Sequence, residues 1–450
     1  MSPAGRPAWP LIAGFRSWLS RAPDLVFSLY GGLMAFGAYF AMYAFRKPFT
    51  VASHAGAAPL LVKYKIALVI AQVFGYALSK VAGIKVISEM PPGRRAVAIV
   101  ALIAAAELSL VLFALVPAPW NVACLFANGL ALGMIWGLVF GFLEGRRQSE
   151  LLGAILCASF IISSGVVKSA GEAVMLAGWA NEYWMPAVTG ALFAPLLLVC
   201  VAGLALLPPP SAEDERLRVA RAPMDGRARR AMFGAYAPGL VALVIIYVGL
   251  TALRDFRDNF AVEIWTGLGF RNDAAIFSFS ELPVAAIVLA TLSGLMFIRD
   301  NRRAFLANLG LVGAGLVIAG GSSLAFQAQA IGPLAWMIAL GAGLYLAYTP
   351  FNALLFDRLI AASGRTGAAG FLIYVADASG YVASATLLVV QNVFGLRLSW
   401  VDFLEMISFV AALAGLALIV AAALYFRRKL PHAAPTGTIV ADALAQTVQP

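Results

Sequence analysis

Apolar stretches recur along the whole chain, each about as long as a segment that crosses a bilayer. A transmembrane helix needs about 20 apolar residues to span the roughly 30 Å hydrocarbon layer. The short alternating segments of β-barrel strands are not seen in this sequence. The pattern therefore predicts an all-α membrane protein. Its twelve expected spans cover approximately 24–56, 63–87, 95–116, 120–143, 149–175, 184–207, 234–260, 273–298, 304–326, 333–356, 366–391 and 402–426.

Composition supports the same fold class and narrows the function. Hydrophobic residues make up 62% of the chain and charged residues 12%, with a mean hydropathy of +0.88. A soluble domain carries about a quarter charged residues, so a soluble globular enzyme is excluded. The sequence shows no nucleophile–base pair, Walker-type loop or metal-ligand cluster, and its 3 cysteines lie unpaired in apolar stretches. We expect a protein that is not an enzyme, without metal or cofactor.

A polar interruption from Pro208 onward divides the spans six and six. The sequence predicts an N-terminal six-helix bundle over 1–207, a cytoplasmic linker over 208–231 and a C-terminal six-helix bundle over 232–430. The tail over 431–450 lacks apolar periodicity and is expected to be disordered. At the other end, the first apolar run is too long for a cleaved signal, so we expect it to be retained, with Trp9 to Leu19 in the membrane interface.

The distribution of basic residues predicts the orientation. Lys and Arg number 32 against 22 Asp and Glu, and 22 of the 32 fall on one side if the N-terminus is cytoplasmic. By the positive-inside rule we expect a multi-pass protein of the cytoplasmic (inner) membrane with both termini cytoplasmic. The excess charge is thus explained without nucleic acid. A twelve-helix unit needs no second copy, so a monomer is expected.

Two sequence features each occur twice in the chain, and the separation between the two copies is the same for both. Arg46 and Arg254 differ by 208 positions, and so do Arg94-Arg95-Ala96 and Arg302-Arg303-Ala304. This coincidence indicates a six-helix unit used twice. Parallel halves around a central site are typical of the major facilitator fold, in which one half rocks against the other.

Charges within the first two spans are candidates for solute binding, because an ionised group inside a membrane faces a cavity or a partner. Tyr39, Tyr43 and Arg46 have the i, i+4, i+7 spacing of one helix face. Two phenols and a guanidinium could hold an anionic group by hydrogen bonds. The alternative is that Arg46 extends to the outer interface. Lys80 lies about 12 Å inside its span, which favours a functional role.

The second half carries its own charges. Arg254 and Arg257 share a helix face, and Asp258 is placed to pair with Arg254 at i+4. These charges are either part of a site or a self-neutralised network at a helix end. Glu281 and Asp377 have no basic residue within one helical turn. Each is either a proton or counter-ion site or the partner of a basic residue on another helix.

Short motifs in this order resemble the organophosphate:phosphate antiporter family, the branch of the major facilitator superfamily that contains glycerol-3-phosphate and hexose-phosphate transporters. The resemblance covers nearly the whole chain. It rests on Tyr39-x-x-x-Tyr43-x-x-Arg46-Lys47-x-Phe49, Gly75-Tyr76, Ser79-Lys80, Gly133-Met134-x-Trp136, Leu253-Arg254, Glu281 and Ala368-Ala369-Gly370-Phe371.

The resemblance implies that Arg46 and Arg254 grip the substrate phosphate from the two halves, with Lys80 beside the site and Glu281 as the acidic residue of the eighth helix. The chain departs from the family where a histidine is expected on the fifth helix, and Ser159 stands there. Span eleven carries Asp377, and span seven has acids beside its arginines. These departures indicate that the chain is a divergent relative of that family.

Together these features predict a secondary active transporter that moves a small anionic, phosphorylated solute by alternating access. Its expected substrate-binding residues are Arg46, Arg254, Lys80, Tyr39, Tyr43 and Ser159. Residues expected to act in coupling or gating are Glu281, Asp377, Arg257 and Asp258. Two alternatives remain: a proton-coupled carrier of a neutral or cationic solute, and a transporter-like receptor that binds without transport.

Overall fold

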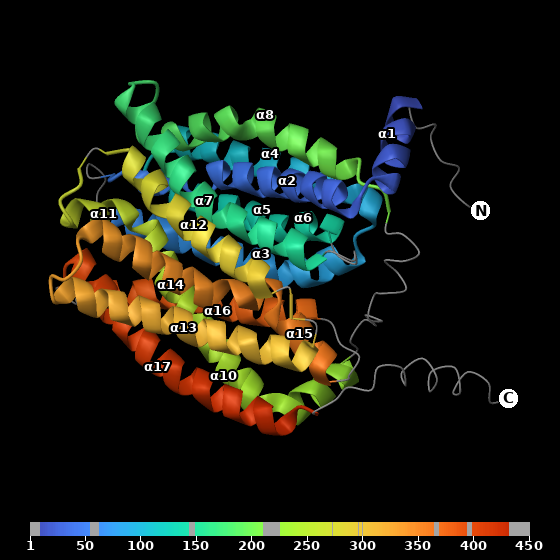
Figure 1. Cartoon of the computed structure of the whole chain (residues 1–450). Coiled ribbons are helices and arrows are strands. Elements are labelled where there is room, and N and C mark those ends of the chain that lie inside the picture. Colours follow the sequence, from blue (N-terminus) through green and yellow to red (C-terminus); the bar gives the residue numbers. More distant parts are fainter. Residues whose placement is uncertain are drawn as a thin grey trace.

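In the computed structural model, helices account for all the regular structure of the described residues, which are 10–54, 63–143, 149–209, 226–271, 273–295, 297–298, 300–363, 369–393 and 398–431. Most of these helices run roughly along one common direction (Figure 1). Within these described residues, eleven helical spans are long and apolar enough to cross a membrane, and a twelfth helix contains the shorter apolar segment Val375–Val390. The prediction of an all-α membrane protein is confirmed.

The six spans of the N-terminal bundle are formed by seven helices, because the fourth span is divided between α5 and α6. The break lies at Gly133 and Met134, where a Cβ on residue 133 would come within 2.6 Å of the Tyr76 carbonyl oxygen on a neighbouring helix. The helices are α2 (Asp24–Met42), α3 (Tyr64–Glu89), α4 (Arg95–Leu115), α5 (Val122–Leu132), α6 (Ile135–Leu143), α7 (Ser149–Leu176) and α8 (Met185–Ala205).

The C-terminal bundle repeats this plan with two short helices added. Arg303 lies in the first turn of α13, the third membrane-spanning helix of this bundle. Arg95 likewise begins α4, the third spanning helix of the N-terminal bundle. The helices are α10 (Gly226–Asn259), α11 (Ala261–Gly267), α12 (Ala275–Leu295), α13 (Asn301–Gln327), α14 (Pro333–Ala353), α15 (Leu355–Ser363), α16 (Ala369–Val393) and α17 (Trp400–Lys429).

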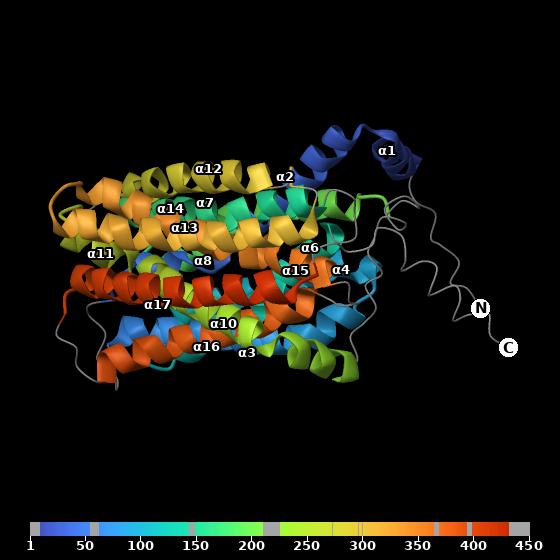
Figure 2. The ribbon, with the colours of Figure 1, turned by 60° about the horizontal axis from the view of Figure 1, so that its bottom comes forward.

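The two ends of the molecule differ. Helix α1 (Pro10–Arg21) lies at one end, where α17 also finishes, and α11 lies at the opposite end (Figures 1 and 2). We call these the terminal end and the α11 end. In Figure 1, α1 runs across the direction of α2, and its Phe15 ring lies 5.5 Å from the ring of Tyr30. Helix α1 is thus held against the first span.

The predicted extension of the first span to residue 56 is wrong. Helix α2 ends at Met42, and two 3₁₀ turns follow, Tyr43–Phe45 and Pro48–Val51. Pro48 has no backbone N–H to donate to the carbonyl four residues earlier, and its ring crowds that carbonyl, which disfavours continuation of the α-helix at this point. Arg46 therefore lies on irregular backbone after the helix and does not share one helix face with Tyr39.

Helix α7 packs against α12, and α3 packs against α16, so these pairs join the two bundles. The α7–α12 contact is close because Gly165 has no side chain: a Cβ there would lie 2.4 Å from the Phe277 carbonyl oxygen. Small residues are typical of such contacts in membranes, where helices gain by close packing and not by leaving water.

Part of the predicted domain division falls outside the described residues. This applies to 210–225 of the linker and to the tail after Pro431. Within the described part, α10 begins at Gly226, so its first turns lie in the segment predicted as linker.

Substitution of either glycine at the α3–α5 contact should destabilise the protein. A Cβ at residue 75 would lie 2.2 Å from the Phe126 carbonyl oxygen, and one at residue 129 would lie 2.1 Å from that of Gln72. Because backbone atoms cannot move aside, we expect Gly75→Ala and Gly129→Ala to cost about 1–3 kcal/mol each. Gly249→Ala is the matched control, because apart from the backbone of its own helix no heavy atom lies within 4 Å of its Cβ position. Thermal unfolding of the purified proteins measures this, and equal Tm values for all three would contradict it.

Candidate functional site

A small cavity of about 20 Å³ lies where the two bundles meet, and it is lined by aromatic and charged side chains. It is large enough for about one water molecule, so the bundles are closed around it in this conformation. Both bundles contribute to its lining: Tyr39, Tyr43, Tyr76, Lys80, Trp136 and Phe160 from the first, and Arg254, Tyr348, Asn352, Asp377 and Tyr381 from the second.

Arg46 is buried directly behind this lining, with 3% of its surface exposed. Its guanidinium carbon lies 3.8 Å from the centre of the Tyr76 ring, and 5.8 Å from the ring centres of Tyr43 and Tyr381. The alternative in which Arg46 reaches the outer interface is therefore wrong. Among the described residues no carboxylate forms an ion pair with it, and its Nε has no hydrogen-bond partner.

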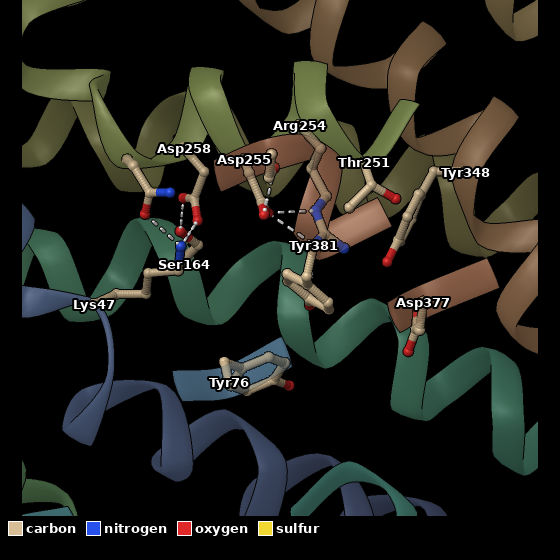
Figure 3. A network of polar contacts seen from close by, with 12 residues as sticks. Lys47, Tyr76, Ser164, Thr251, Arg254, Asp255, Asp258, Tyr348, Asp377 and Tyr381 are labelled. Atoms are coloured by element: carbon tan, nitrogen blue, oxygen red, sulfur yellow. Dashed lines mark hydrogen bonds and ion pairs between the residues drawn. The ribbon is translucent and has the colours of Figure 1, made fainter. Parts of the chain in front are cut away.

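Arg254 faces the same centre from the other bundle (Figure 3). Its guanidinium carbon lies 4.3 Å from the centre of the Tyr348 ring, and its Nη2 donates to the Tyr381 hydroxyl at 3.2 Å. The same Nη2 donates to Asp255 Oδ1 at 2.8 Å, and Asp255 also accepts a hydrogen bond from Ser384. Tyr381 thus lies between the two arginines, with its ring centre 5.8 Å from each guanidinium carbon.

The expected pairing of Arg254 with Asp258 is wrong. The carboxylate of Asp258 is turned toward Lys47 of the N-terminal bundle (Figure 3). It pairs there with Lys47 and also with Lys168. The adjacent Asp255 takes its place beside Arg254. The i+4 rule compares residues on one helix only, whereas here lysines from other elements provide the closer partners.

Lys80 and Asp377 form a buried ion pair that joins the bundles. Lys80 Nζ lies 2.9 Å from Asp377 Oδ2, and their side chains are 4% and 5% exposed. The Tyr247 hydroxyl donates to the other carboxylate oxygen. Lys80 Nζ also lies 5.3 Å from the centre of the Trp136 ring. Of the two alternatives for Asp377, the structure shows it as the partner of a base on another helix.

Glu281 is likewise paired. It accepts a hydrogen bond of 2.7 Å from Arg257 Nη1, within the C-terminal bundle. Arg257 also donates to the Met337 carbonyl at 3.0 Å. These two residues and Asp258 are therefore held in ion pairs outside the central cavity, while Asp377 lines it.

The remaining predicted residues differ in their placement. Tyr39 and Tyr43 line the cavity, and the Tyr39 hydroxyl lies 3.5 Å from that of Tyr76. Ser159 is fully buried, donates to the Leu156 carbonyl oxygen at 2.5 Å and does not line the cavity. The next residue, Phe160, lines the cavity in its place.

Most of the aromatic residues that line the cavity are not among the residues predicted from the sequence. A usable signal existed, since Tyr348 and Asn352, and likewise Asp377 and Tyr381, have the i, i+4 spacing of one helix face. Tyr76 belongs to the Gly75-Tyr76 motif, but the motif alone does not predict a place in the site. Aromatic residues are frequent in membrane helices, so spacing alone does not separate those around a cavity from those in the core.

Comparison with solved structures gives the same fold. The crystal structure of a D-xylose-proton symporter matches with a TM-score of 0.59 and 14% identity, over 91% of this chain and 98% of that one. The human organic anion transporter MFSD10 (TETRAN) matches with a TM-score of 0.53 and 13% identity, over 90% and 100%. The predicted major facilitator fold of two six-helix bundles is thereby confirmed.

Comparison of sequences gives a family. No curated protein matches the chain. These findings do not distinguish the organophosphate:phosphate antiporter branch from other transporters of this fold, and the resemblance to that branch stays a prediction. One sequence profile matches residues 48–429, which is most of the chain. The chain therefore belongs to the family described as "Family of unknown function (DUF5690)".

Proposed function

We propose that the protein is a secondary transporter that carries a small anionic solute by alternating access, with its binding site at the cavity between the bundles. The fold is that of two transporters. Sites of such proteins lie at the interface of the two halves near the middle of the membrane. Here the interface holds a polar, aromatic-lined cavity in which both halves supply charged groups.

The unbalanced charge of Arg46 carries the proposal. At the centre, Arg254 is paired with Asp255 and Lys80 with Asp377, whereas Arg46 has no carboxylate partner among the described residues. A buried charge without a partner is costly. Its positive field is partly balanced by the faces of neighbouring aromatic rings. A solute anion would complete the balance, which favours an anion over a neutral or cationic solute.

Arg46 and Arg254 are suited to an oxyanion such as a phosphate group. A guanidinium presents parallel donors that match two oxygens of one phosphate or carboxylate. In this proposal each bundle supplies one arginine, so a bound anion draws the bundles together, and Tyr39 and Tyr43 orient it. Exchange for inorganic phosphate is the coupling that the resemblance implies.

The Lys80–Asp377 pair favours a second candidate, a proton-coupled carrier of a neutral or cationic solute. This pair and Arg257–Glu281 show that most buried charges are already balanced. In that case a solute without negative charge enters together with a proton on a carboxylate. Uptake that proton uncouplers abolish and phosphate esters do not inhibit would select this candidate.

The orientation belongs to the same proposal. The terminal end carries Arg16 and Arg21 of α1, Arg302 near the start of α13, and Arg427 and Arg428 at the end of α17. By the positive-inside rule this end faces the cytoplasm and the α11 end faces outward. We propose a cytoplasmic-membrane location, with a monomer as the working unit.

Ligand-dependent thermal stabilisation of the purified protein tests the proposed function. The panel contains inorganic phosphate, glycerol 3-phosphate, a hexose phosphate, succinate and neutral sugars. We expect the anions to raise Tm and the Arg46→Ala variant to lose this response. Stabilisation by neutral sugars alone, unchanged in Arg46→Ala, would contradict the anion site and support the second candidate.

A further inference from the structure

Asp258 lies at the centre of a polar cluster near the α11 end, apart from the central cavity (Figure 3). Its carboxylate accepts hydrogen bonds from Lys168 and Ser164 on one oxygen and pairs with Lys47 through the other. Lys168 also donates to the Asp258 backbone carbonyl at 2.6 Å, and Lys47 donates to Asn259 Oδ1 at 2.8 Å. Both lysines are nearly fully buried, with side chains 3% and 4% exposed.

The donors and the acceptor of this cluster come from different bundles. Lys47 follows α2, and Ser164 and Lys168 are one turn apart on α7, so all three donors belong to the N-terminal bundle. Asp258 is the penultimate residue of α10 in the C-terminal bundle. Two ammonium groups thus share one carboxylate, which leaves a net positive charge in the cluster.

We propose that Lys47, Ser164 and Lys168 form a second anion-binding site on the N-terminal bundle, in which the Asp258 carboxylate now occupies the position of a solute oxyanion. The inference rests on the proposed function, because it requires the bundles to separate at the α11 end. On separation Asp258 moves away with the C-terminal bundle. The three donors then face the opening together, and a carboxylate or phosphate group fits the place that Asp258 leaves.

Charge gives the reason why an anion would bind there. Removing one partner from a buried ion pair leaves an uncompensated charge, which is strongly unfavourable. Separation of the bundles would leave the charges of Lys47 and Lys168 uncompensated. An anion arriving from the α11 end compensates them and so favours the open state, and it is then close to the central arginines. The site would serve as the first contact of the solute with the protein.

A neighbouring ion pair that also joins the bundles lacks the additional donors of the Asp258 cluster. Lys65 of α3 and Glu263 of α11 also join the bundles, with Lys65 Nζ 2.6 Å from Glu263 Oε1. This is a pair of one base and one acid, and its acid is 21% exposed. Loss of Glu263 would free a single lysine and would not create a three-donor site. It is the matched control for Asp258.

Chemical rescue tests the proposal. Asp258→Ala removes the carboxylate and leaves its position open to a small anion. We expect the variant to have a lower Tm than the wild type. Sodium formate or acetate should raise that Tm by about 2 °C or more in a saturable manner, compared with sodium chloride at equal ionic strength. Neither salt should stabilise Glu263→Ala in this way, and the wild type, whose site is filled by Asp258, should not respond.

Further variants show where the anion binds. Rescue should be lost in Asp258→Ala/Lys168→Gln and retained in Asp258→Ala/Arg254→Gln, because Arg254 belongs to the central site. If Asp258→Ala cannot be purified, Asp258→Ser still leaves room for a small anion because its side chain is shorter, and its titration with formate gives the same comparison. Equal effects of formate and chloride on either Asp258 variant would overturn the inference.

This outcome is separate from the fate of the proposed function. If the proposed function is wrong, no anion of the panel stabilises the wild type. Failure of the second site appears as wild-type stabilisation by such an anion together with no rescue in the Asp258 variants.

Discussion

Replacement of Arg46 by alanine is expected to abolish solute uptake while the protein still inserts and folds. Arg46 has no carboxylate partner to be left unpaired among the described residues, so its removal frees no buried acid. It would remove two charge-assisted hydrogen bonds to the solute, worth about 1.5–3 kcal/mol each, which corresponds to a loss of at least about 100-fold in affinity. Uptake of radiolabelled phosphate or phosphate ester into proteoliposomes measures this effect.

Two further variants make the result specific. Arg46→Lys keeps the charge but not the planar pair of donors, so we expect partial activity. Arg303→Ala removes an exposed arginine at the terminal end and should leave uptake unchanged. Arg254→Ala should resemble Arg46→Ala in uptake, although it also leaves Asp255 without its arginine. Full uptake by Arg46→Ala with an unaltered concentration dependence would rule out its contact with the solute.

The second large effect is expected on stability, at the Lys80–Asp377 pair. Both side chains are almost completely buried, so removing one leaves the other charged and unsolvated. We expect Lys80→Met and Asp377→Leu as single substitutions each to cost about 3–5 kcal/mol. The double variant Lys80→Met/Asp377→Leu replaces the pair by apolar groups of similar size and should recover most of that loss. Denaturant or thermal unfolding of the four proteins forms a double-mutant cycle.

Additive losses in this cycle would contradict the ion pair, because two independent sites do not compensate each other. Since α3 and α16 belong to different bundles, strong coupling between the two substitutions would also show that the pair joins the bundles in the dominant conformation. The double variant is not expected to transport, because Lys80 and Asp377 both line the cavity.

Much of the fold could be predicted because the bilayer restricts it. A spanning helix must be apolar for about 20 residues, whatever it packs against. The predicted first span is wrong at Pro48, where local backbone chemistry ends the helix. The predicted fourth span agrees with the structure, but it is divided into two helices at Gly133. The proline was visible in the sequence. The close approach of Tyr76 to Gly133 was not, because it depends on a second helix.

The candidate site was predictable only in part. Arg46, Arg254 and Lys80 were selected because a charge within a membrane span is costly, and the structure buries all three. The sequence does not predict their partners correctly. Helix spacing predicts that Asp258 pairs with Arg254, yet it bonds to Lys47 and Lys168 of the other bundle. The resemblance to the organophosphate:phosphate antiporter family implies a site role for Ser159, but its hydroxyl bonds within its own helix.

The sequence by itself determined that this protein is a bundle of apolar helices in two similar halves, with a few charges that cannot face lipid. Hydrophobicity and the 208-residue repeat are properties of the chain alone and do not depend on which helices meet. Only the tertiary structure decided which charge pairs with which, and that Arg46 remains unpaired among the described residues. The reason is that an ion pair depends on distances of 2 to 4 Å between side chains, and these are set by how α3, α7, α10 and α16 pack across the two bundles.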